Sequence, residues 1–331
     1  MLLLEYVWID GVNKLRSKTR CIEDINIVVN IKNIPEWNYD GSSTYQASCE
    51  KSEVVLSPCA IFKDPFRRNT NSYIVLCSTY TVEGKPLSNN HRHNASKLFN
   101  NEEDPWFGLE QEYFICNELT GYPLGYTPDI IQGQYYCSVG TNNTFGRKIV
   151  EEHLEACLYA GIKISGINAE VAPGQWEFQI GICKGIEAGD HLWVARYLLE
   201  RIAENNGVVI DYHPKPKHNI NGSGCHTNFS TRKMRTPGIG MEEINRVISL
   251  LGEKHEEHIK IYGKYNNLRL IGTSETSSMK HFSYGIGDRS VSVRIGNETV
   301  KNGYGYIEDR RPASNIDPYL VTSKIFETCC L

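Results

Sequence analysis

The sequence predicts a chain of mixed α and β structure in two parts, a small and mostly β part followed by a larger part that is either α/β or α+β. The length of 331 residues exceeds that of one ordinary domain. Short strand patterns dominate the early chain, and long helix patterns alternate with strands afterwards. Turn residues cluster at Gly84–Pro86, so we place the two domains at residues 1–87 and 88–331.

The first part contains segments with the β-branched and aromatic composition that is typical of strands. Helix patterns are scarce between them, and we therefore predict a mostly β domain. The expected strands are Glu5–Ile9, Ile27–Ile31, Val54–Leu56 and Tyr73–Thr79.

Three segments of the second part place apolar residues at the spacing of an amphipathic helix. Gly146–Ala160 is followed by Gly161, which can adopt the left-handed conformation common at helix C-termini. Asp190–Asn205 and Met241–Ile261 show the same apolar spacing. The sequence therefore predicts three long helices.

Composition and charge exclude several classes of protein. Forty per cent of the residues are hydrophobic, which excludes a disordered or collagen-like chain. A net charge of -4 gives no basic excess for binding nucleic acid. No apolar run approaches the roughly 18 residues of a membrane helix, and the opening segment lacks the positive start of a signal peptide. We expect a soluble, cytoplasmic protein without nucleic-acid or membrane partners.

The eleven cysteines form no Cys-x-x-Cys pair, and Cys329 and Cys330 are adjacent. This spacing fits neither a zinc site nor a disulfide framework. We expect reduced, buried and structurally inert thiols, as in a cytosolic protein.

Glu110 and Glu112 are the first candidate metal ligands. The residues around them, Trp106–Ile115, favour a strand, in which residues two apart share a face. The two carboxylates should therefore point the same way. Most such pairs face solvent, so metal binding and simple exposure both remain open.

Glu170 and Glu177 flank a Pro173–Gly174 turn between two strand patterns. If these two turn residues are central, Glu170 lies directly across from Glu177. Like charges in opposite positions destabilise a hairpin unless a cation lies between them, and a divalent metal is the obvious candidate. The alternative is a bulge that turns one glutamate to solvent.

His226 and Glu308 complete the candidate set. His226 lies in Asn221–Ser230, a probable strand whose glycines allow close backbone approach, although a lone histidine is usually structural. Glu308 lies near Arg310 and Arg311, which also fits a surface salt bridge.

Five carboxylates and one imidazole, without a cysteine, favour Mg²⁺ or Mn²⁺ over zinc. Such ions usually hold phosphates, and arginine is the preferred bidentate partner of phosphate. Arg289 and Arg294 are five residues apart, so a bend is needed for both to reach one ligand. The candidate arginines are Arg269, Arg289, Arg294, Arg310 and Arg311.

These residues, in this order, resemble the eukaryotic-type (type II) glutamine synthetase family. The resemblance implies an α+β fold, with an N-terminal β-grasp domain and a larger catalytic domain of antiparallel strands and helices around a funnel-shaped active site. The likeness runs from Tyr6–Asp10 to Asp317–Tyr319, and its motifs are Trp37–Thr44, Gly108–Tyr113, Asn168–Gly181, Asn221–Ser230 and Tyr306–Pro312.

The resemblance implies an ATP-dependent ligase that converts glutamate and ammonium to glutamine through γ-glutamyl phosphate. About two or three Mg²⁺ or Mn²⁺ ions would serve each active site. By motif position, one metal would be held by Glu112, Glu170 and Glu177. The metals bridging the ATP phosphates would be held by Glu110, His226 and Glu308.

The same motif positions imply the remaining roles. Asp40, Ser43 and Glu275 match the ammonium site, where Asp40 accepts a proton and Glu275 closes over the intermediate. The implied catalytic residues are Asp40, Glu275, Arg289 and Arg310. The implied ATP-binding residues are Trp106, Asn228, Ser230, Arg289, Arg294 and Tyr306. The implied glutamate-binding residues are Glu112, Asn221, Gly222, His226, Arg269 and Arg310.

In this family the loop carrying Asp40 and Ser43 completes the site of a neighbouring subunit, which implies a homodecamer of two stacked pentameric rings. Three positions depart from the family pattern: Ser274 replaces a usual histidine, and Ile182 and Gly296 replace usual prolines. The chain also begins later than the family pattern and ends soon after Cys330. A related glutamate–amine ligase and a catalytically silent structural relative are the alternatives.

Overall fold

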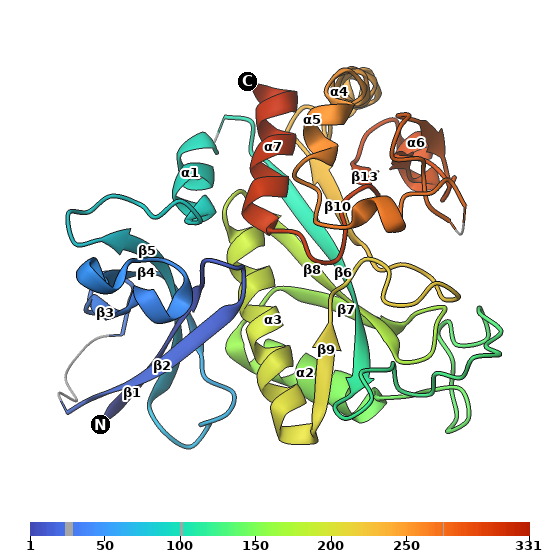
Figure 1. Ribbon diagram of the computed structural model, residues 1–331. Helices are drawn as coiled ribbons and strands as arrows, with labels where there is room; N and C mark the ends of the chain where they lie inside the picture. The colour runs from blue at the N-terminus through green and yellow to red at the C-terminus, as the bar shows by residue number, and fades with distance from the viewer. Residues whose placement is uncertain (24–28, 100–101, 274) are drawn as a thin grey trace. The chain divides into compact units, whose positions relative to one another are not determined.

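The computed structural model describes residues 1–23, 29–99, 102–273 and 275–331. They form two compact units, whose elements are labelled in Figure 1. The first unit comprises Met1–Lys97 with Glu155–Ile162, and the second comprises Leu98–Leu154 with Lys163–Leu331.

The first unit is built on a five-stranded mixed sheet with the strand order β2-β1-β5-β4-β3. The central strands β1 and β5 are parallel, and the other pairs are antiparallel. The elements are β1 (Leu2–Ile9), β2 (Leu15–Ile22), β3 (Trp37–Asp40), β4 (Glu53–Lys63) and β5 (Ser72–Thr81), with the short helices η1 (Gly41–Thr44), η2 (Cys49–Lys51) and α1 (His91–Leu98).

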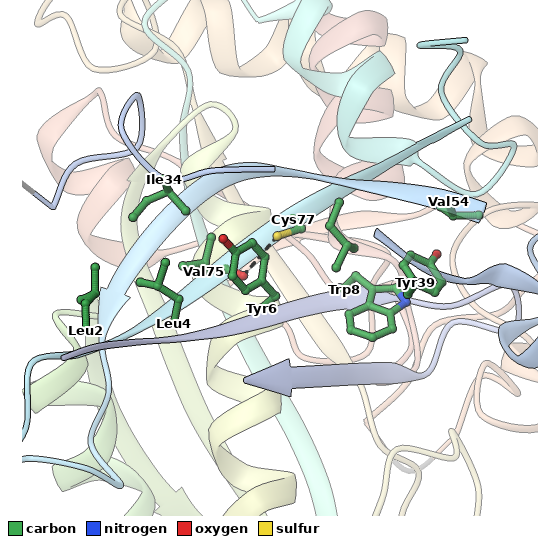
Figure 2. Close-up of a cluster of buried hydrophobic side chains, with 10 residues drawn as sticks. Leu2, Leu4, Tyr6, Trp8, Ile34, Tyr39, Val54, Val75 and Cys77 are labelled. Atoms are coloured by element: carbon green, nitrogen blue, oxygen red, sulfur yellow. Dashed lines mark hydrogen bonds between the residues drawn. The ribbon is translucent and has the colours of Figure 1, made fainter. Parts of the chain in front are cut away.

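Alternation along β1 creates the core of this unit. Leu2, Leu4, Tyr6 and Trp8 are two residues apart and share one buried face. Figure 2 shows them with side chains from the neighbouring strands. Burial of each such side chain stabilises the fold by about 1.5–3 kcal/mol. Their partners are Ile34, Tyr39, Val54, Leu56, Val75 and Cys77.

Three of the four strands predicted in the first part are present, within β1, β4 and β5. The fourth, Ile27–Ile31, lies partly outside the described residues, and residues 29–31 form no strand. β2 was not predicted, because charged residues alternate along it at the edge of the sheet.

The second unit contains an eight-stranded sheet with the order β11-β12-β13-β10-β6-β8-β7, in which β9 also pairs with β6. All pairs are antiparallel except β11 with β12. The strands are β6 (Trp106–Asn117), β7 (Ile164–Ala169), β8 (Gln175–Lys184), β9 (Val208–Asp211), β10 (Cys225–Ser230), β11 (Tyr284–Ile286), β12 (Val293–Ile295) and β13 (Ile307–Asp309).

Helix α3 packs on β6, β8 and β9, and α7 packs in turn against α3, α4 and α5 (Figure 1). Thirteen residues of α3 are buried, which makes it the central helix of the second unit. The helices of the second unit are α3 (Glu187–Asn206), α4 (Gly240–Glu253), α5 (His255–Ile259), α6 (Asn297–Asn302) and α7 (Pro318–Cys330), with the short η3 (Asn266–Leu268). Helix α2 (Arg147–Ala160) is divided, with residues 147–154 in the second unit and 155–160 in the first. The α+β prediction is confirmed.

The two predicted helices Gly146–Ala160 and Asp190–Asn205 are present as α2 and α3. The prediction of one helix over Met241–Ile261 is wrong, because the chain leaves the helical conformation at Lys254, where ψ is 15°. The break turns His255 so that its Nε2 lies 3.0 Å from the carbonyl oxygen of Met279. Helix α5 begins at His255, so two helices stand where one was predicted.

All eleven cysteines are free thiols. Six of them are buried, but Cys21, Cys49 and Cys137 are exposed, so the expectation of burial is wrong for those three. Among the described residues, no helix combines the length and the apolar composition needed to cross a membrane.

Candidate active site

Four neighbouring strands bring polar side chains to one cavity of the second unit. Glu110 and Glu112 share a face of β6, as predicted, and both line this cavity. The strand register places Glu112 opposite Glu177 of β8 and Glu110 opposite His226 of β10. Strand β13 adds Glu308. Residues distant in the sequence thus meet because the sheet aligns them.

The cavity has a volume of about 270 Å³ and is lined almost entirely by polar side chains. It brings together every site residue predicted for metal and glutamate binding. Of the predicted residues, those lining it are Glu110, Glu112, Glu170, Glu177, Asn221, Gly222, His226, Arg269, Glu275, Arg289, Arg294, Glu308 and Arg310.

The predicted turn between Glu170 and Glu177 is wrong in its register. Strand β7 ends at Ala169 and β8 begins at Gln175. Glu170 N–H donates to the Gln175 carbonyl oxygen, so these two residues pair and the turn between them has four residues, 171–174, rather than two. Glu177 therefore faces Asn168 and lies diagonal to Glu170.

The cause of this register lies outside the turn. Ile115 N–H donates to the carbonyl oxygen of Gly174 at 2.8 Å, which ties the turn to β6. Gly174 has φ 67°, and a Cβ atom there would lie 2.9 Å from backbone atoms of Leu124. The hydrogen bond from β6 and the close approach of Leu124 thus hold Gly174 in this turn.

Glu110, His226 and Glu308 form one group suited to a metal ion, with a potential ligand atom from each within 4.8 Å of the others. Nδ1 of His226 lies 3.5 Å from both Oε2 of Glu110 and Oε1 of Glu308. Burial and the nearby Arg310 lower the pKa of His226 well below its usual value. A neutral imidazole between two carboxylates is a donor set for a divalent cation.

Glu112, Glu170 and Glu177 form a second group in which ionisation is unfavourable. Burial raises the pKa of Glu177 to about 8 and the pKa of Glu170 to about 6. Burial, followed by the charges of Glu170 and Glu177, raises the pKa of Glu112 well above its usual value. A divalent cation would reverse this crowding, because opposite charge favours the ionised carboxylates.

The carboxylate of Glu112 is held on one side. Its Oε2 accepts hydrogen bonds from Gln175 Nε2 and from Gly224 N–H, each at 3.1 Å. Its Oε1 lies 4.0 Å from Nε2 of His226. One oxygen is therefore anchored by the protein while the other faces the imidazole.

Arginine side chains line the rest of the cavity. Arg310 donates to Oε1 of Glu308 at 2.5 Å, and Arg294 donates to Oε2 of Glu308 at 2.8 Å. The chain bends between Arg289 and Arg294, so both reach the same cavity, as the sequence required. These guanidinium groups give one wall of the cavity a positive charge.

Arg269 and Arg311 are placed differently from the other arginines. Arg269 is buried, and its terminal N–H groups donate to the main-chain carbonyl oxygens of Arg310, Arg311 and Pro312. Arg311 does not line the cavity; it is fully buried and donates to both oxygens of Asp309. Arg311 lies two residues beyond the end of β13 and bonds to Asp309, the neighbour of Glu308 in that strand.

A second cavity of about 540 Å³ has a mostly apolar lining. Four of the residues predicted to bind ATP line it: Trp106, Asn228, Ser230 and Tyr306. The other two, Arg289 and Arg294, line the first cavity instead. Glu110 and Gln179 line both cavities. An apolar pocket thus adjoins a charged one, which suits a nucleotide whose phosphates reach the charged groups.

Sequence reasoning missed several residues of the two cavities. Asn168 and Gln179 lie two residues from Glu170 and Glu177, so strand alternation could have found them. Arg235 carried no local signal. Its guanidinium lies 3.8 Å from the centre of the Trp106 ring, and it donates to Ser230 Oγ at 2.8 Å.

Asp40 and Ser43 belong to the first unit, where Asp40 is the N-cap of η1. Its carboxylate accepts hydrogen bonds from Ser42 N–H at 3.0 Å and from Ser43 Oγ at 3.1 Å. Hydrogen bonds from Ser42 lower the pKa of Asp40. Of the three departures, Ile182 lines the second cavity, Gly296 is the N-cap of α6, and Ser274 lies outside the described residues.

Comparison with known proteins identifies the family. Residues 89–252 match the family described as "Glutamine synthetase, catalytic domain". A "Glutamine synthetase" of Saccharomyces cerevisiae is 52% identical over 99% of this chain and 89% of its own length. The chain belongs to the eukaryotic-type glutamine synthetase family.

Two further relatives and one solved structure also match nearly the whole chain. A "Putative glutamine synthetase" of Acanthamoeba polyphaga mimivirus is 58% identical, over 99% of this chain and 94% of its own length. "Glutamine synthetase cytosolic isozyme 1-1" of Oryza sativa is 52% identical over 99% of this chain and 93% of its own length. A solved structure titled "GmaS/ADP complex-Conformation 1" shares the fold, with a TM-score of 0.77 at 16% identity over 99% of this chain and 78% of that one.

Proposed function

We propose that this chain joins glutamate to ammonium, with ATP as the energy source, and forms glutamine through an enzyme-bound γ-glutamyl phosphate. One observation carries the proposal: a cavity crowded with carboxylates and arginines shares Glu110 and Gln179 with an apolar pocket. Phosphoryl transfer needs this combination of a nucleotide pocket, cation ligands and positive charge. Membership of the glutamine synthetase family agrees with it.

ATP and a divalent metal serve the family, and we propose Mg²⁺ or Mn²⁺ as the metal here. The ligand atoms are carboxylate oxygens and one neutral imidazole, which fits these ions. Bound cations would neutralise the phosphates during transfer. Glu112, Glu170 and Glu177 would hold the ion near glutamate. Glu110, His226 and Glu308 would hold those near the ATP phosphates.

The nucleotide and glutamate would occupy adjacent cavities. We propose Trp106, Asn228, Ser230 and Tyr306 for the nucleoside. Arg289, Arg294 and Arg310 would face the transferred phosphoryl group, because their guanidinium groups line the cavity that holds the carboxylates.

The glutamate substrate would lie against Asn221, Gly222 and His226, beside Glu112 and Arg310. Arg269 would shape this surface, since a Cβ atom on Gly222 would lie 2.6 Å from Cγ of Arg269. The side-chain carboxylate of glutamate attacks the γ-phosphorus, the bond to the β-phosphate oxygen breaks, and ADP leaves. Ammonia then displaces phosphate from the acyl phosphate.

Asp40, Ser43 and Glu275 are proposed for the ammonium step. Hydrogen bonds from Ser42 lower the pKa of Asp40, which favours the ionised carboxylate and so the binding of a cation such as ammonium. The carbonyl oxygen of Glu275 accepts a hydrogen bond from Arg310 at 3.4 Å, which links its loop to the phosphate-facing arginine. Glu275 would cover the acyl phosphate and exclude water.

We further propose that the chain assembles into a homodecamer of two pentameric rings, in which Asp40 and Ser43 serve a neighbouring subunit. We also propose two domains, at residues 1–87 and 88–331. The proposed location is the cytoplasm. Sedimentation or light scattering of the purified protein would measure the assembly, and a monomeric mass in a fully active preparation would overturn it.

The decisive test of the chemistry is γ-glutamyl hydroxamate formation from glutamate, hydroxylamine, ATP and Mg²⁺ or Mn²⁺. We expect product with the parent protein and a loss of at least about 100-fold for Arg310→Gln, because one transition-state donor is removed. Lys233→Gln, an exposed substitution outside both cavities, is the control and should retain activity. Absence of product from a folded oligomer would overturn the proposed function. A preference for an organic amine over ammonium in competition would indicate a different amine substrate.

A further inference from the structure

Arg196 of α3 is a buried arginine behind the sheet that carries the carboxylates, with 3% of its surface exposed. Its Nε and Nη2 donate to Oε1 of Gln111 at 2.9 and 2.5 Å. Its remaining hydrogen bonds go to the carbonyl oxygens of Ser314 at 2.9 Å and Ile316 at 2.8 Å. In the described chain, each hydrogen-bond acceptor of this guanidinium is an uncharged carbonyl or amide oxygen.

Burying a guanidinium without a hydrogen-bonded carboxylate costs free energy, which well-aligned hydrogen bonds must offset. Two aromatic rings contribute to the stabilisation that offsets this cost. The guanidinium carbon lies 4.9 Å from the centre of the Trp193 ring and 5.3 Å from the centre of the Tyr212 ring. A leucine or methionine would fill such a space at lower cost. The arginine is therefore explained by what its donors hold in place.

Gln111 lies between Glu110 and Glu112 on β6 and is fully buried on the opposite face. Its Nε2 donates to the carbonyl oxygen of Glu112 at 2.7 Å and to the carbonyl and hydroxyl oxygens of Ser314, each at 3.0 Å. Because Arg196 occupies its Oε1, the amide can present only its N–H groups to these atoms.

Ser314 completes the network. Its Oγ donates to the carbonyl oxygen of Glu112 at 2.6 Å, so this oxygen accepts from both Gln111 and Ser314. Glu112 N–H donates to the carbonyl oxygen of Gly224 at 3.0 Å. Both polar groups of the Glu112 main chain are thus fixed, and with them the direction of its side chain.

We infer that Arg196 is a positioning residue for the carboxylate of Glu112: by holding Gln111 and Ser314 it fixes the rotation of β6 that aims Glu112 into the cavity. The inference rests on the proposed role of Glu112 as a metal ligand. Residues that orient a metal ligand from behind typically change metal affinity by about 10–100-fold when they are replaced.

The test measures Mn²⁺ binding without substrates, from the electron paramagnetic resonance signal of free Mn²⁺ over a titration of the assembled protein. The variants are Arg196→Lys, Glu112→Gln and the double variant. We expect each single variant to lower the affinity for the Mn²⁺ ion that Glu112 binds by about tenfold or more. The double variant should bind no more weakly than Glu112→Gln, because Arg196 acts through Glu112.

Leu199→Ala is the matched control, since Leu199 is fully buried on the same helix but is no part of this network. It should lower the unfolding temperature and leave the Mn²⁺ affinity of the folded protein unchanged. If Arg196→Lys fails to fold, Ser314→Ala removes one donor to the Glu112 carbonyl oxygen, and we expect a Mn²⁺ affinity several-fold weaker by the loss of about 1 kcal/mol.

The outcomes separate the two proposals. Unchanged Mn²⁺ affinity in Arg196→Lys or in its substitute Ser314→Ala, or additive losses in the double variant, would overturn the positioning role alone. Unchanged Mn²⁺ affinity in Glu112→Gln would instead overturn the metal role of Glu112, and with it the basis of the proposed function at this residue.

Discussion

Glu112 and Glu177 lie directly opposite each other on the adjacent antiparallel strands β6 and β8. Both are largely buried, and burial raises the pKa of each carboxyl group. The sheet thus places two acids where their charged forms repel. This cost to the protein without metal is the counterpart of an affinity for cations, and it can be measured.

Glu177→Gln should stabilise the metal-free protein at pH 8.5, above the pKa of about 8 that Glu177 has in the folded state. Removal of the repulsion should raise the unfolding temperature in EDTA by about 2–4 °C, the shift that roughly 1 kcal/mol produces. The further rise on adding Mn²⁺ should be smaller than in the parent protein. Differential scanning fluorimetry measures both shifts.

The control for this experiment is Glu118→Gln, at an exposed carboxylate just beyond β6. It should leave both unfolding temperatures close to those of the parent. An unfolding temperature in EDTA that falls in Glu177→Gln, with an undiminished response to Mn²⁺, would contradict the repulsion described above.

Trp106→Ala should weaken nucleotide binding about tenfold, since the ring forms part of the apolar pocket and lies under Arg235. Titration with a fluorescent ATP analogue measures this affinity. Trp106→Phe keeps a flat ring and should retain most of the binding. Equal nucleotide affinities in the alanine variant and the parent would exclude Trp106 from the nucleotide site.

Gly222→Ala should raise the KM for glutamate by about tenfold while the affinity for nucleotide stays the same. The added Cβ atom would lie 2.6 Å from Cγ of Arg269 and 2.7 Å from the carbonyl oxygen of Pro214, so the backbone must move. Gly296→Ala is the matched control, because its Cβ atom meets no other atom within 4 Å. An unchanged KM for glutamate would separate Gly222 from the substrate surface.

His153→Gln should reduce the slope with which the free energy of unfolding depends on pH between about 6.5 and 4. Burial lowers the pKa of His153 from 6.5 to about 4 in the folded state. Below pH 6.5 the unfolded chain therefore binds a proton that the folded state excludes. The free energy of unfolding decreases as the pH is lowered, by on the order of 3 kcal/mol at pH 4. Glutamine keeps a donor for the Ala195 carbonyl oxygen, 2.9 Å from Nε2.

Urea unfolding at several pH values measures this slope. His258, whose pKa burial lowers to about 3, contributes to the same pH range and remains in the variant, so a reduced slope rather than a flat profile is expected. Val75→Ala shortens a fully buried side chain in the core of the first unit, a cluster that does not include His153, and should lower stability equally at every pH. An unaltered slope in His153→Gln would show that another group governs the acid range.

Local patterns predicted those parts of the fold that depend on neighbouring residues. Strand alternation alone placed Glu110 and Glu112 on one face, and apolar spacing located α3 within a few residues. The turn after Glu170 was predicted wrongly because its register depends on β6, a contact across more than fifty residues. The local pattern also missed the end of α4 at Lys254, which is followed by a contact of His255 with Met279, 24 residues further along the chain.

The partners of the site were less predictable than its ligands. Nothing near Arg196 in the sequence indicates that it bonds to Gln111, which lies 85 residues away. Arg235 likewise reaches Trp106 only through the tertiary fold. The motif positions thus gave the residues that face the cavities, whereas the residues that support them became visible only in three dimensions.

Because Glu110 and Gln179 belong to both cavities, the two binding surfaces are not independent traits. A substitution at either position alters both at once, so selection cannot retune the preference for one substrate without disturbing the other. Evolutionary change in substrate choice has more freedom at positions that line one cavity alone, such as Tyr304 or Tyr136, than at the two positions that the cavities share.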